Sequence, residues 1–140
     1  MAVVARYLVD TSAAARAAHP AVAGRLSPLV GAGLVATCAP LDFEALYSAR
    51  SPAQYDEVRA DRALAYEYVP TYDEDWHSAL EIQSRLARTG QHRSVGMPDL
   101  LVAVVAARER LTVLHYDRDF DTIASITGQP TEWVVPAGTA

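Results

Sequence analysis

Short apolar runs alternate with longer helical segments along this chain, and this alternation restricts the possible folds more than any other feature of the sequence. The runs at 6–9, 34–38 and 111–115 are too short for helices and are typical of buried strands. Prolines near the start of the intervening segments suit the first turn of a helix. Strands that alternate with helices predict a mostly parallel sheet covered by helices on both faces.

Proline, glycine and the apolar spacing set the expected boundaries. We expect strands at 6–9, 34–38, 68–70, 111–115 and 132–135, and helices at 12–18, 20–30, 40–49, 51–66, 73–88, 100–109 and 120–126. Trp76, Leu80 and Leu86 share one face of their helix and are expected to point into the core. The helix at 100–109 is apolar on nearly every side and should be buried. The sequence therefore predicts one three-layer α/β/α domain over residues 1–140, with a mostly parallel sheet of four to five strands and a mobile tail at 136–140.

The composition excludes several classes of protein. A formal net charge of -5 argues against a broad basic surface for nucleic acid. All 12 basic residues are arginine, so a Walker-type phosphate loop and lysine Schiff-base chemistry are excluded. Receiver domains and haloacid-dehalogenase-like phosphatases, which use a lysine beside their acids, are excluded too. The single Cys38 cannot form an internal disulfide. No apolar run approaches the roughly 20 residues of a membrane span and no signal peptide is visible, so we expect no membrane attachment and a cytoplasmic location.

Acidic residues fall at or near the ends of the expected strands. Asp10 follows the first strand, and Asp117 follows the strand at 111–115. Asp99 begins the helix before that strand, and Glu44 lies one turn into the helix after the second strand. Ligands of open parallel sheets bind at the carboxyl ends of the strands. We therefore expect these four carboxylates to converge there.

Each of these acids also has a purely structural explanation. Asp10 and Asp99 could each cap a helix, a contribution of about 1 kcal/mol. Glu44 is harder to explain in this way, because the apolar Phe43 and Tyr47 flank it. Asp42 lies about 200° away around the same helix and is interpreted as an ordinary first-turn acid.

The acids are more informative together than singly. Carboxylates about 5 Å apart repel by roughly 3 kcal/mol per pair at an effective dielectric constant of about 20. A cluster of four is strained unless some are protonated or a divalent cation lies between them. Oxygen ligands without thiolates or paired histidines favour Mg²⁺ or Mn²⁺. The histidines show no metal spacing and are expected mainly at the surface, with His115 near enough to Asp117 to touch the rim of the site: His19, His77, His92 and His115.

Four segments, in order and at characteristic distances, carry a resemblance to a known family: 8–12 (LVDTS), 43–48 (FEALYS), 98–103 (PDLLVA) and 115–120 (HYDRDF). They resemble the PIN domain, and specifically the VapC-type toxins of bacterial toxin–antitoxin pairs, over nearly the whole chain. The resemblance implies a set of catalytic metal ligands: Asp10, Glu44, Asp99 and Asp117. It also implies auxiliary roles for Ser12, or less often Thr11, and for Asp119. PIN domains differ in which acid of the last pair contacts the metal, and we favour Asp117 over Asp119.

The resemblance also implies an activity and partners. A VapC-type chain is expected to be a divalent-metal-dependent endoribonuclease that hydrolyses RNA phosphodiester bonds as the toxin of a type II toxin–antitoxin pair. It is expected to form a homodimer and to bind a small VapB-like antitoxin whose basic tail occupies the acidic groove.

Two further points stay open in the sequence. Arg85, Arg88, His92 and Arg93 are predicted to guide RNA to the acids, although cations that complement a helix dipole explain them equally well. The alternative functions are a PIN nuclease of RNA maturation or DNA repair, and a non-catalytic binding domain with a vestigial metal site. A phosphatase that depends on paired acids is disfavoured by the missing lysine and by Ser12, where a second aspartate would be expected.

Overall fold

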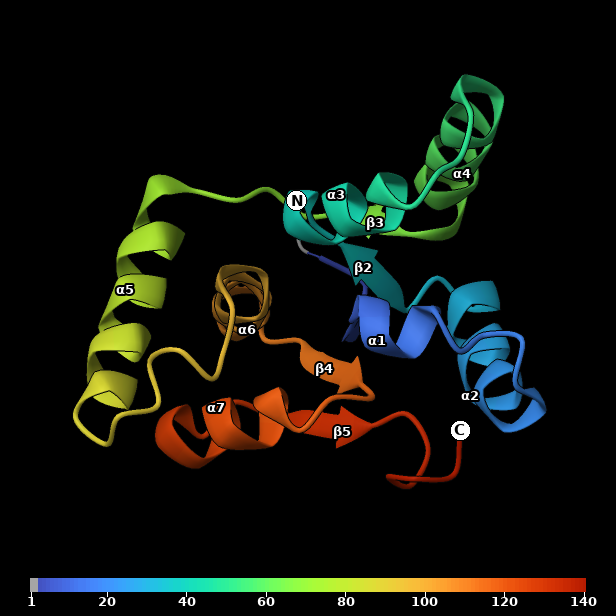
Figure 1. The fold of residues 1–140 in the computed structure, drawn as a ribbon. Coiled ribbons are helices and arrows are strands. Elements are labelled where there is room, and N and C mark those ends of the chain that lie inside the picture. The colour runs from blue at the N-terminus through green and yellow to red at the C-terminus, as the bar shows by residue number, and fades with distance from the viewer. Residues whose placement is uncertain (1–2) are drawn as a thin grey trace.

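The computed structural model describes residues 3–140, which form alternating strands and helices (Figure 1). The elements are β1 (Tyr7–Val9), α1 (Thr11–Ala14), α2 (Pro20–Gly31), β2 (Val35–Thr37), α3 (Ala39–Tyr47), α4 (Pro52–Ala65), β3 (Glu67–Tyr68), α5 (Asp73–Ala87), α6 (Met97–Glu109), β4 (Thr112–His115), α7 (Asp119–Thr127) and β5 (Thr131–Trp133). The expected order of elements is confirmed. The first helix is shorter than the expected 12–18, because after Ala14 the backbone hydrogen bonds join residues three apart instead of four, as from Arg16 N to Ala13 O (3.0 Å).

The central sheet has the strand order β3-β2-β1-β4-β5, and each neighbouring pair of the described strands is parallel. This confirms the predicted parallel α/β architecture. The central strand β1 pairs with β2 on one side and β4 on the other, with Leu8 opposite both Ala36 and Val113. Just beyond β1, the amide of Asp10 donates to Leu114 O at 2.8 Å. Asp10 is therefore held beside the carboxyl end of β4.

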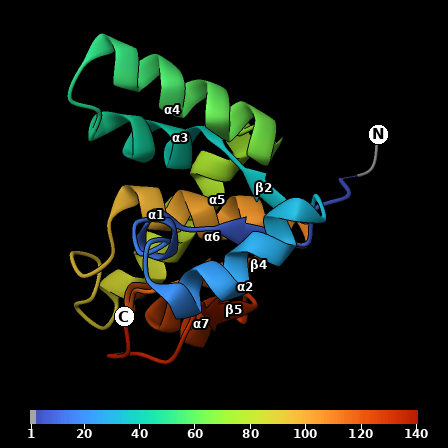
Figure 2. The same cartoon turned by 90° about the vertical axis from the view of Figure 1, so that its right-hand side faces the viewer.

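Each face of the sheet has its own hydrophobic core, because successive strand residues point to opposite faces. Leu8 and Val113 belong to the core formed with α3, α5, α6 and α7. Their neighbours Val9 and Leu114 belong to the core formed with α1 and α2. Every residue from Leu100 to Ala106 in α6 is buried, which confirms the expected buried helix. The resulting three layers are visible in Figures 1 and 2.

Helix α4 lies outside both cores. None of its residues, all of which the structure describes, is buried, and Leu64 is 88% exposed. It packs on α3 and projects from the rest of the molecule (Figure 1). The ion pair between Arg62 Nε and Asp42 Oδ1 (3.0 Å) joins the two helices, and Thr37 Oγ1 donates to the same Asp42 oxygen at 2.8 Å. Asp42 thus belongs to this junction.

The expected inward face of α5 is partly wrong. Leu86 is buried as expected, but Trp76 is 44% and Leu80 59% exposed, while Asp75 is only 2% exposed. The cause is Arg108 on α6, whose guanidinium contacts both Asp75 carboxylate oxygens at 2.9 and 3.0 Å. A carboxylate paired in this way can be buried. The inward face of α5 therefore consists of Asp75, Ala79, Ile82 and Leu86, and it begins one residue before the expected Trp76. Among residues 3–140, the structure contains no helix with the length and apolar character of a membrane span.

Candidate metal centre

Asp10 stands at the end of β1 and caps α1. Its Oδ2 accepts hydrogen bonds from Ser12 N (3.0 Å) and from Ser12 Oγ (2.6 Å). The side chain is 3% exposed, and among the described residues its buried Oδ1 has no hydrogen-bond partner. An unpartnered buried carboxylate oxygen is costly unless a cation or donor approaches it. The Oδ1 atom of Asp10 is therefore available to bind a cation.

Ser12 connects the two strands that carry the site. Its hydroxyl donates to Asp10 and accepts from Tyr116 N at 2.9 Å, one residue before Asp117. One side chain therefore fixes the Asp10 carboxylate relative to the chain that leaves β4. Thr11, the other hydroxyl considered from the sequence, donates to Glu44 Oε1 at 3.5 Å instead.

Three aspartates gather beside Asp10. Asp99 lies in the first turn of α6, Asp117 follows β4, and Asp119 begins α7. Oxygen atoms of these three carboxylates lie within 4.8 Å of one another. Asp117 Oδ1 also accepts the Asp119 amide at 2.9 Å, a local bond that turns the chain into α7. Both acids of the final pair are thus near Asp99, and the choice between them as ligand stays open.

The electrostatics of the site follow from this crowding. Burial, followed by repulsion from Asp10 and then from Asp117, raises the pKa of Asp99 to about 8. Burial and then the charge of Asp117 raise the pKa of Asp119 above its ordinary value. Protonated acids at neutral pH are an alternative to a bound cation, so proton and metal would compete for the same oxygens.

Glu44 on α3 completes the group. Burial and then the charge of Asp10 raise its pKa, and the Thr11 hydroxyl opposes that shift. The expectation of an apolar surrounding is wrong, because Phe43 is 78% and Tyr47 93% exposed. These two side chains are four residues apart and share a face of α3, about 100° (Phe43) and about 60° (Tyr47) from Glu44 around the helix.

His115 is buried instead of lying at the surface. Its ring packs against Phe120 and Trp133, with centroids 5.1 and 5.0 Å away, and its Nδ1 accepts the Asp117 amide at 3.2 Å. Burial lowers the pKa of this imidazole. The donors that face the centre are consequently carboxylate and hydroxyl oxygens, a set that fits Mg²⁺ or Mn²⁺.

Of the predicted RNA-guiding residues, Arg85 lies in the last turn of α5, and the other three lie between α5 and α6. Arg85 donates to Ile126 O, so its guanidinium braces α7. Arg88, His92 and Arg93 are exposed in the segment that leads into α6 and Asp99. Figure 2 shows this segment on the same side of the molecule as α1 and the C-terminus.

The sequence reasoning missed Arg16 and Tyr116. The guanidinium carbon of Arg16 lies 4.2 Å from the centroid of the Tyr116 ring, and Arg16 Nη1 donates to Ser12 O at 2.8 Å. The sequence carried no signal for this arrangement, because Arg16 lies beyond the end of α1 at Ala14 and bonds the backbone carbonyl of Ser12 instead of its side chain. Tyr116 Oη also accepts the amide of Ala140, in the tail whose mobility stays a prediction.

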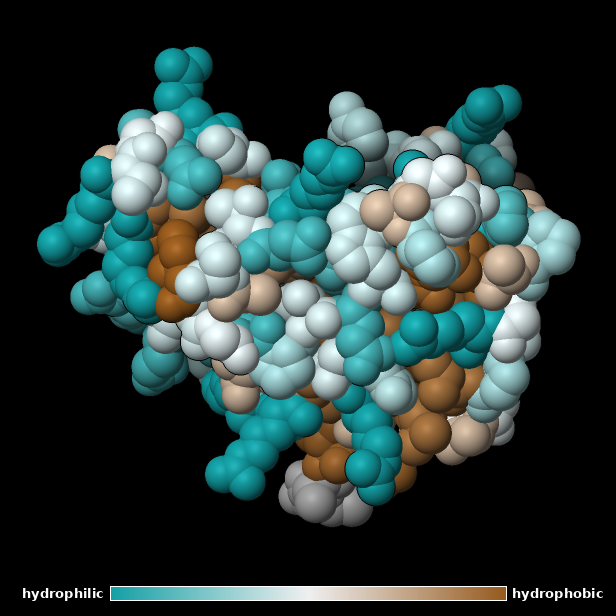
Figure 3. Space-filling view, turned by 90° about the horizontal axis from the view of Figure 1, so that it is seen from below, coloured by the Kyte–Doolittle hydropathy of each residue, from teal (hydrophilic) through white to brown (hydrophobic). Residues whose placement is uncertain are grey.

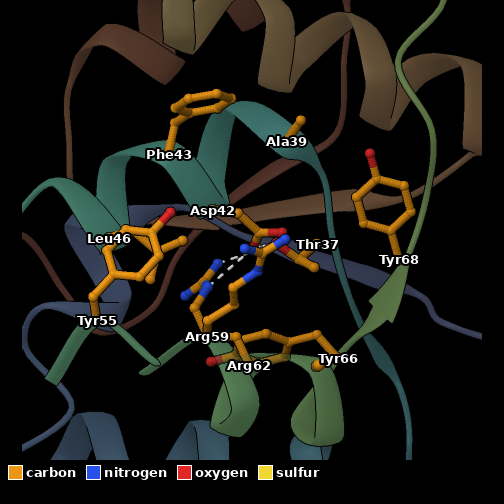
Figure 4. A pocket seen from close by; sticks show the side chains of 11 residues that line it. Thr37, Ala39, Asp42, Phe43, Leu46, Tyr55, Arg59, Arg62, Tyr66 and Tyr68 are labelled. Carbon is orange, nitrogen blue, oxygen red and sulfur yellow. Dashed lines mark hydrogen bonds and ion pairs between the residues drawn. The ribbon is translucent and has the colours of Figure 1, made fainter. Parts of the chain in front are cut away.

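A separate cavity of about 460 Å³ lies between α3 and α4 (Figure 4). Asp42 and Thr37 point toward Arg62 in it, and Leu46, Tyr55 and Tyr66 contribute to its walls. It contains none of the four converging acids, so it is distinct from the metal centre.

Comparison with known proteins gives concordant results. The family model described as PIN domain matches residues 7–126. The chain is 51% identical over 135 residues to Ribonuclease VapC21 of Mycobacterium tuberculosis, covering 96% of this chain and 98% of that protein. It is 42% identical to Ribonuclease VapC51 of the same organism, covering 96% of each.

Solved structures share the fold. The DNA-bound VapBC of Salmonella typhimurium contains a chain that matches with a TM-score of 0.76 at 18% identity, over 94% of this chain and 99% of that one. VapBC-5 of Mycobacterium tuberculosis matches with a TM-score of 0.57 at 26% identity, over 92% of this chain and 97% of that one.

Proposed function

This chain belongs to the PIN-domain family, and we propose that it is a divalent-metal-dependent endoribonuclease acting as the toxin of a type II toxin–antitoxin pair. The observation that carries the proposal is a group of acids from separate elements: oxygens of Asp99, Asp117 and Asp119 lie within 4.8 Å of one another. The charges of Asp10 and Glu44 act on Asp99 as well, and the buried Oδ1 of Asp10 has no hydrogen-bond partner among the described residues. The relatives named ribonucleases support RNA as the substrate. A cytoplasmic location is part of this proposal.

In this proposal, one set of residues binds the metal and another residue positions a ligand. The proposed ligands of one or two Mg²⁺ or Mn²⁺ ions are Asp10, Glu44, Asp99 and Asp117, with Asp119 as an alternative or additional ligand. When bound, such ions activate water and neutralise charge on the phosphate. Ser12 holds Asp10 Oδ2 in place and leaves Oδ1 available. Asp99, with a pKa of about 8, must lose a proton to become a charged ligand, so metal binding should strengthen as the pH rises toward 8.

The proposal is tested by incubating labelled RNA with the protein in Mn²⁺ and in EDTA. Wild type should cleave only with the metal, and Asp10→Asn should lose at least a hundredfold of the rate while keeping its melting temperature within a few degrees. Asp61→Asn, which removes the same charge from an exposed position on α4, is the matched control and should cleave normally. Undiminished cleavage by the Asp10 variant would remove the central residue from the scheme.

We propose a small VapB-like antitoxin as the protein partner, in line with the VapBC complexes among the similar structures. A basic tail would complement the acidic centre, since opposite charges steer association. The face of the molecule drawn in Figure 3 exposes hydrophobic residues, coloured brown, on its right-hand side. A groove beside α2, lined by Leu26, Val30 and Tyr66 among others, is a second contact surface in this proposal. A polybasic peptide should inhibit cleavage competitively, whereas an acidic peptide of the same length should not.

We also propose that the chain forms a homodimer through α3 and α5. Both helices pack on α6, and both expose large apolar side chains to solvent: Phe43, Tyr47, Trp76 and Leu80. Contiguous exposed apolar patches typically mark interaction surfaces, and we assign these four side chains to the dimer interface. Light scattering should give twice the chain mass of 15.1 kDa, and Trp76→Glu should shift the protein to the monomer.

A further inference from the structure

An acidic nuclease must attract a polyanion, and the metal centre contributes only negative side chains. Several arginines that could assist are already engaged. Arg25, Arg62 and Arg108 form ion pairs with carboxylates, and Arg85 is bonded to a backbone carbonyl of α7. Arg16 is different, because it lies against residues of the centre itself.

Arg16 is fixed at the centre by two contacts. Its Nη1 donates to Ser12 O at 2.8 Å, and its guanidinium carbon lies 4.2 Å from the centroid of Tyr116. Ser12 in turn bonds both Asp10 and the Tyr116 amide. Arg16 therefore contacts the residue that bonds Asp10, which is Ser12, and the residue that precedes Asp117, which is Tyr116.

The donors of Arg16 are only partly used. No ion pair between Arg16 and a carboxylate occurs among residues 3–140, although four acids converge nearby. A guanidinium has five N–H donors in a planar fork that matches phosphate oxygens. One donor is bonded to Ser12 O, and the aromatic ring supports one face of the plane through a cation–π contact. The remaining donors are held in place without a protein anion.

We propose that Arg16 binds the RNA phosphate next to the one that is hydrolysed, and so positions the strand across the carboxylates. This inference rests on the proposed nuclease function and adds a substrate contact to it. Arg16 is a positioning residue, because it takes up no proton and holds no metal. A pre-oriented guanidinium loses less conformational entropy on binding phosphate than a freely rotating lysine side chain.

Binding measurements test the proposal without requiring cleavage. The probe is a fluorescein-labelled single-stranded RNA of 20 nucleotides, titrated with full-length protein in Ca²⁺ at several salt concentrations. Arg16→Ala should raise Kd about tenfold and reduce the slope of log K against log salt by about 0.7, the value for one lost phosphate contact. Arg16→Lys should keep the slope but bind a few-fold more weakly. Arg110→Ala removes an exposed arginine at the opposite end of α6 from Asp99 and should leave both values near wild type.

A second measurement separates phosphate binding from a merely structural role. A methylphosphonate removes the charge of one phosphate, and single replacements along the RNA should weaken wild-type binding most at one position. The binding of Arg16→Ala should not be weakened further by the replacement at that position, but should respond like wild type to the replacements elsewhere. If Arg16→Ala weakens binding equally for every replacement, or keeps the wild-type salt slope, the proposal is overturned. If wild type binds RNA in this way but fails to cleave it with Mn²⁺, the nuclease function fails while the Arg16 contact stands.

Discussion

Replacing Asp99 by asparagine should stabilise the metal-free protein at pH 8 and change its stability little at pH 5. The folded-state pKa of Asp99 is about 8, against an ordinary value of 3.8, so the folded protein binds an extra proton between these limits. Stability is therefore full below about pH 4 and falls as the pH rises toward 8. Four pKa units correspond to at most about 5.5 kcal/mol, and screening by solvent and sharing among the coupled acids reduce this to about 2–3 kcal/mol.

Asparagine escapes this penalty because it has no charge to desolvate. It loses a favourable interaction with the α6 dipole of about 0.5 kcal/mol, which is smaller. The variant should therefore melt about 5–10 °C above wild type at pH 8 in EDTA, and the difference should fall to roughly a quarter of this at pH 5 and vanish near pH 4. With saturating Mn²⁺ the order should reverse, since a ligand at a hundred times its Kd stabilises by about 2.7 kcal/mol.

Urea unfolding at pH 5, 6.5 and 8 in EDTA measures the effect directly. Asp61→Asn on exposed α4 serves as the control for loss of one charge far from the centre. If wild type and Asp99→Asn show the same dependence on pH, the electrostatic reasoning about the cluster is refuted.

Two further predictions follow from the hydrogen-bond geometry. Arg108→Ala leaves the buried Asp75 without its cation and should lower the free energy of unfolding by about 3–5 kcal/mol; the double variant with Asp75→Ala should recover part of this loss in the same urea experiment. Ser12→Ala removes the hydroxyl shared by Asp10 and Tyr116 and should cost about 1–2 kcal/mol in stability and at least tenfold in the Mn²⁺-dependent cleavage rate, so a wild-type rate would show that Ser12 has no positioning role.

The parallel sheet and the converging acids could be predicted because they depend on local patterns and one topological rule. Asp10 and Asp117 follow apolar runs that must be strands, and parallel strands end at a common edge. Asp99 was identified through the proline and buried helix around it. The inward face of α5 could not be predicted in this way, since Asp75 is buried only because Arg108, distant in sequence, pairs with it.

Long-range packing also explains the remaining differences. His115 is buried because Phe120 and Trp133 from later elements enclose its ring. Arg16 was missed because the expected helix at 12–18 ends at Ala14, and only the folded β4–α7 connection brings Tyr116 beneath the guanidinium. Neither contact leaves a pattern in the local sequence.

The separateness of α4 from both hydrophobic cores has a consequence for dynamics. A helix that buries no residue detaches for a small fraction of the global unfolding free energy, so α4 should open as an independent cooperative unit while the sheet stays intact. The ion pair between Asp42 and Arg62 must break for α4 to detach from α3. Because α3 carries both Asp42 and Glu44, amide exchange in α4 would report on events at the acidic edge of the sheet without any probe placed there.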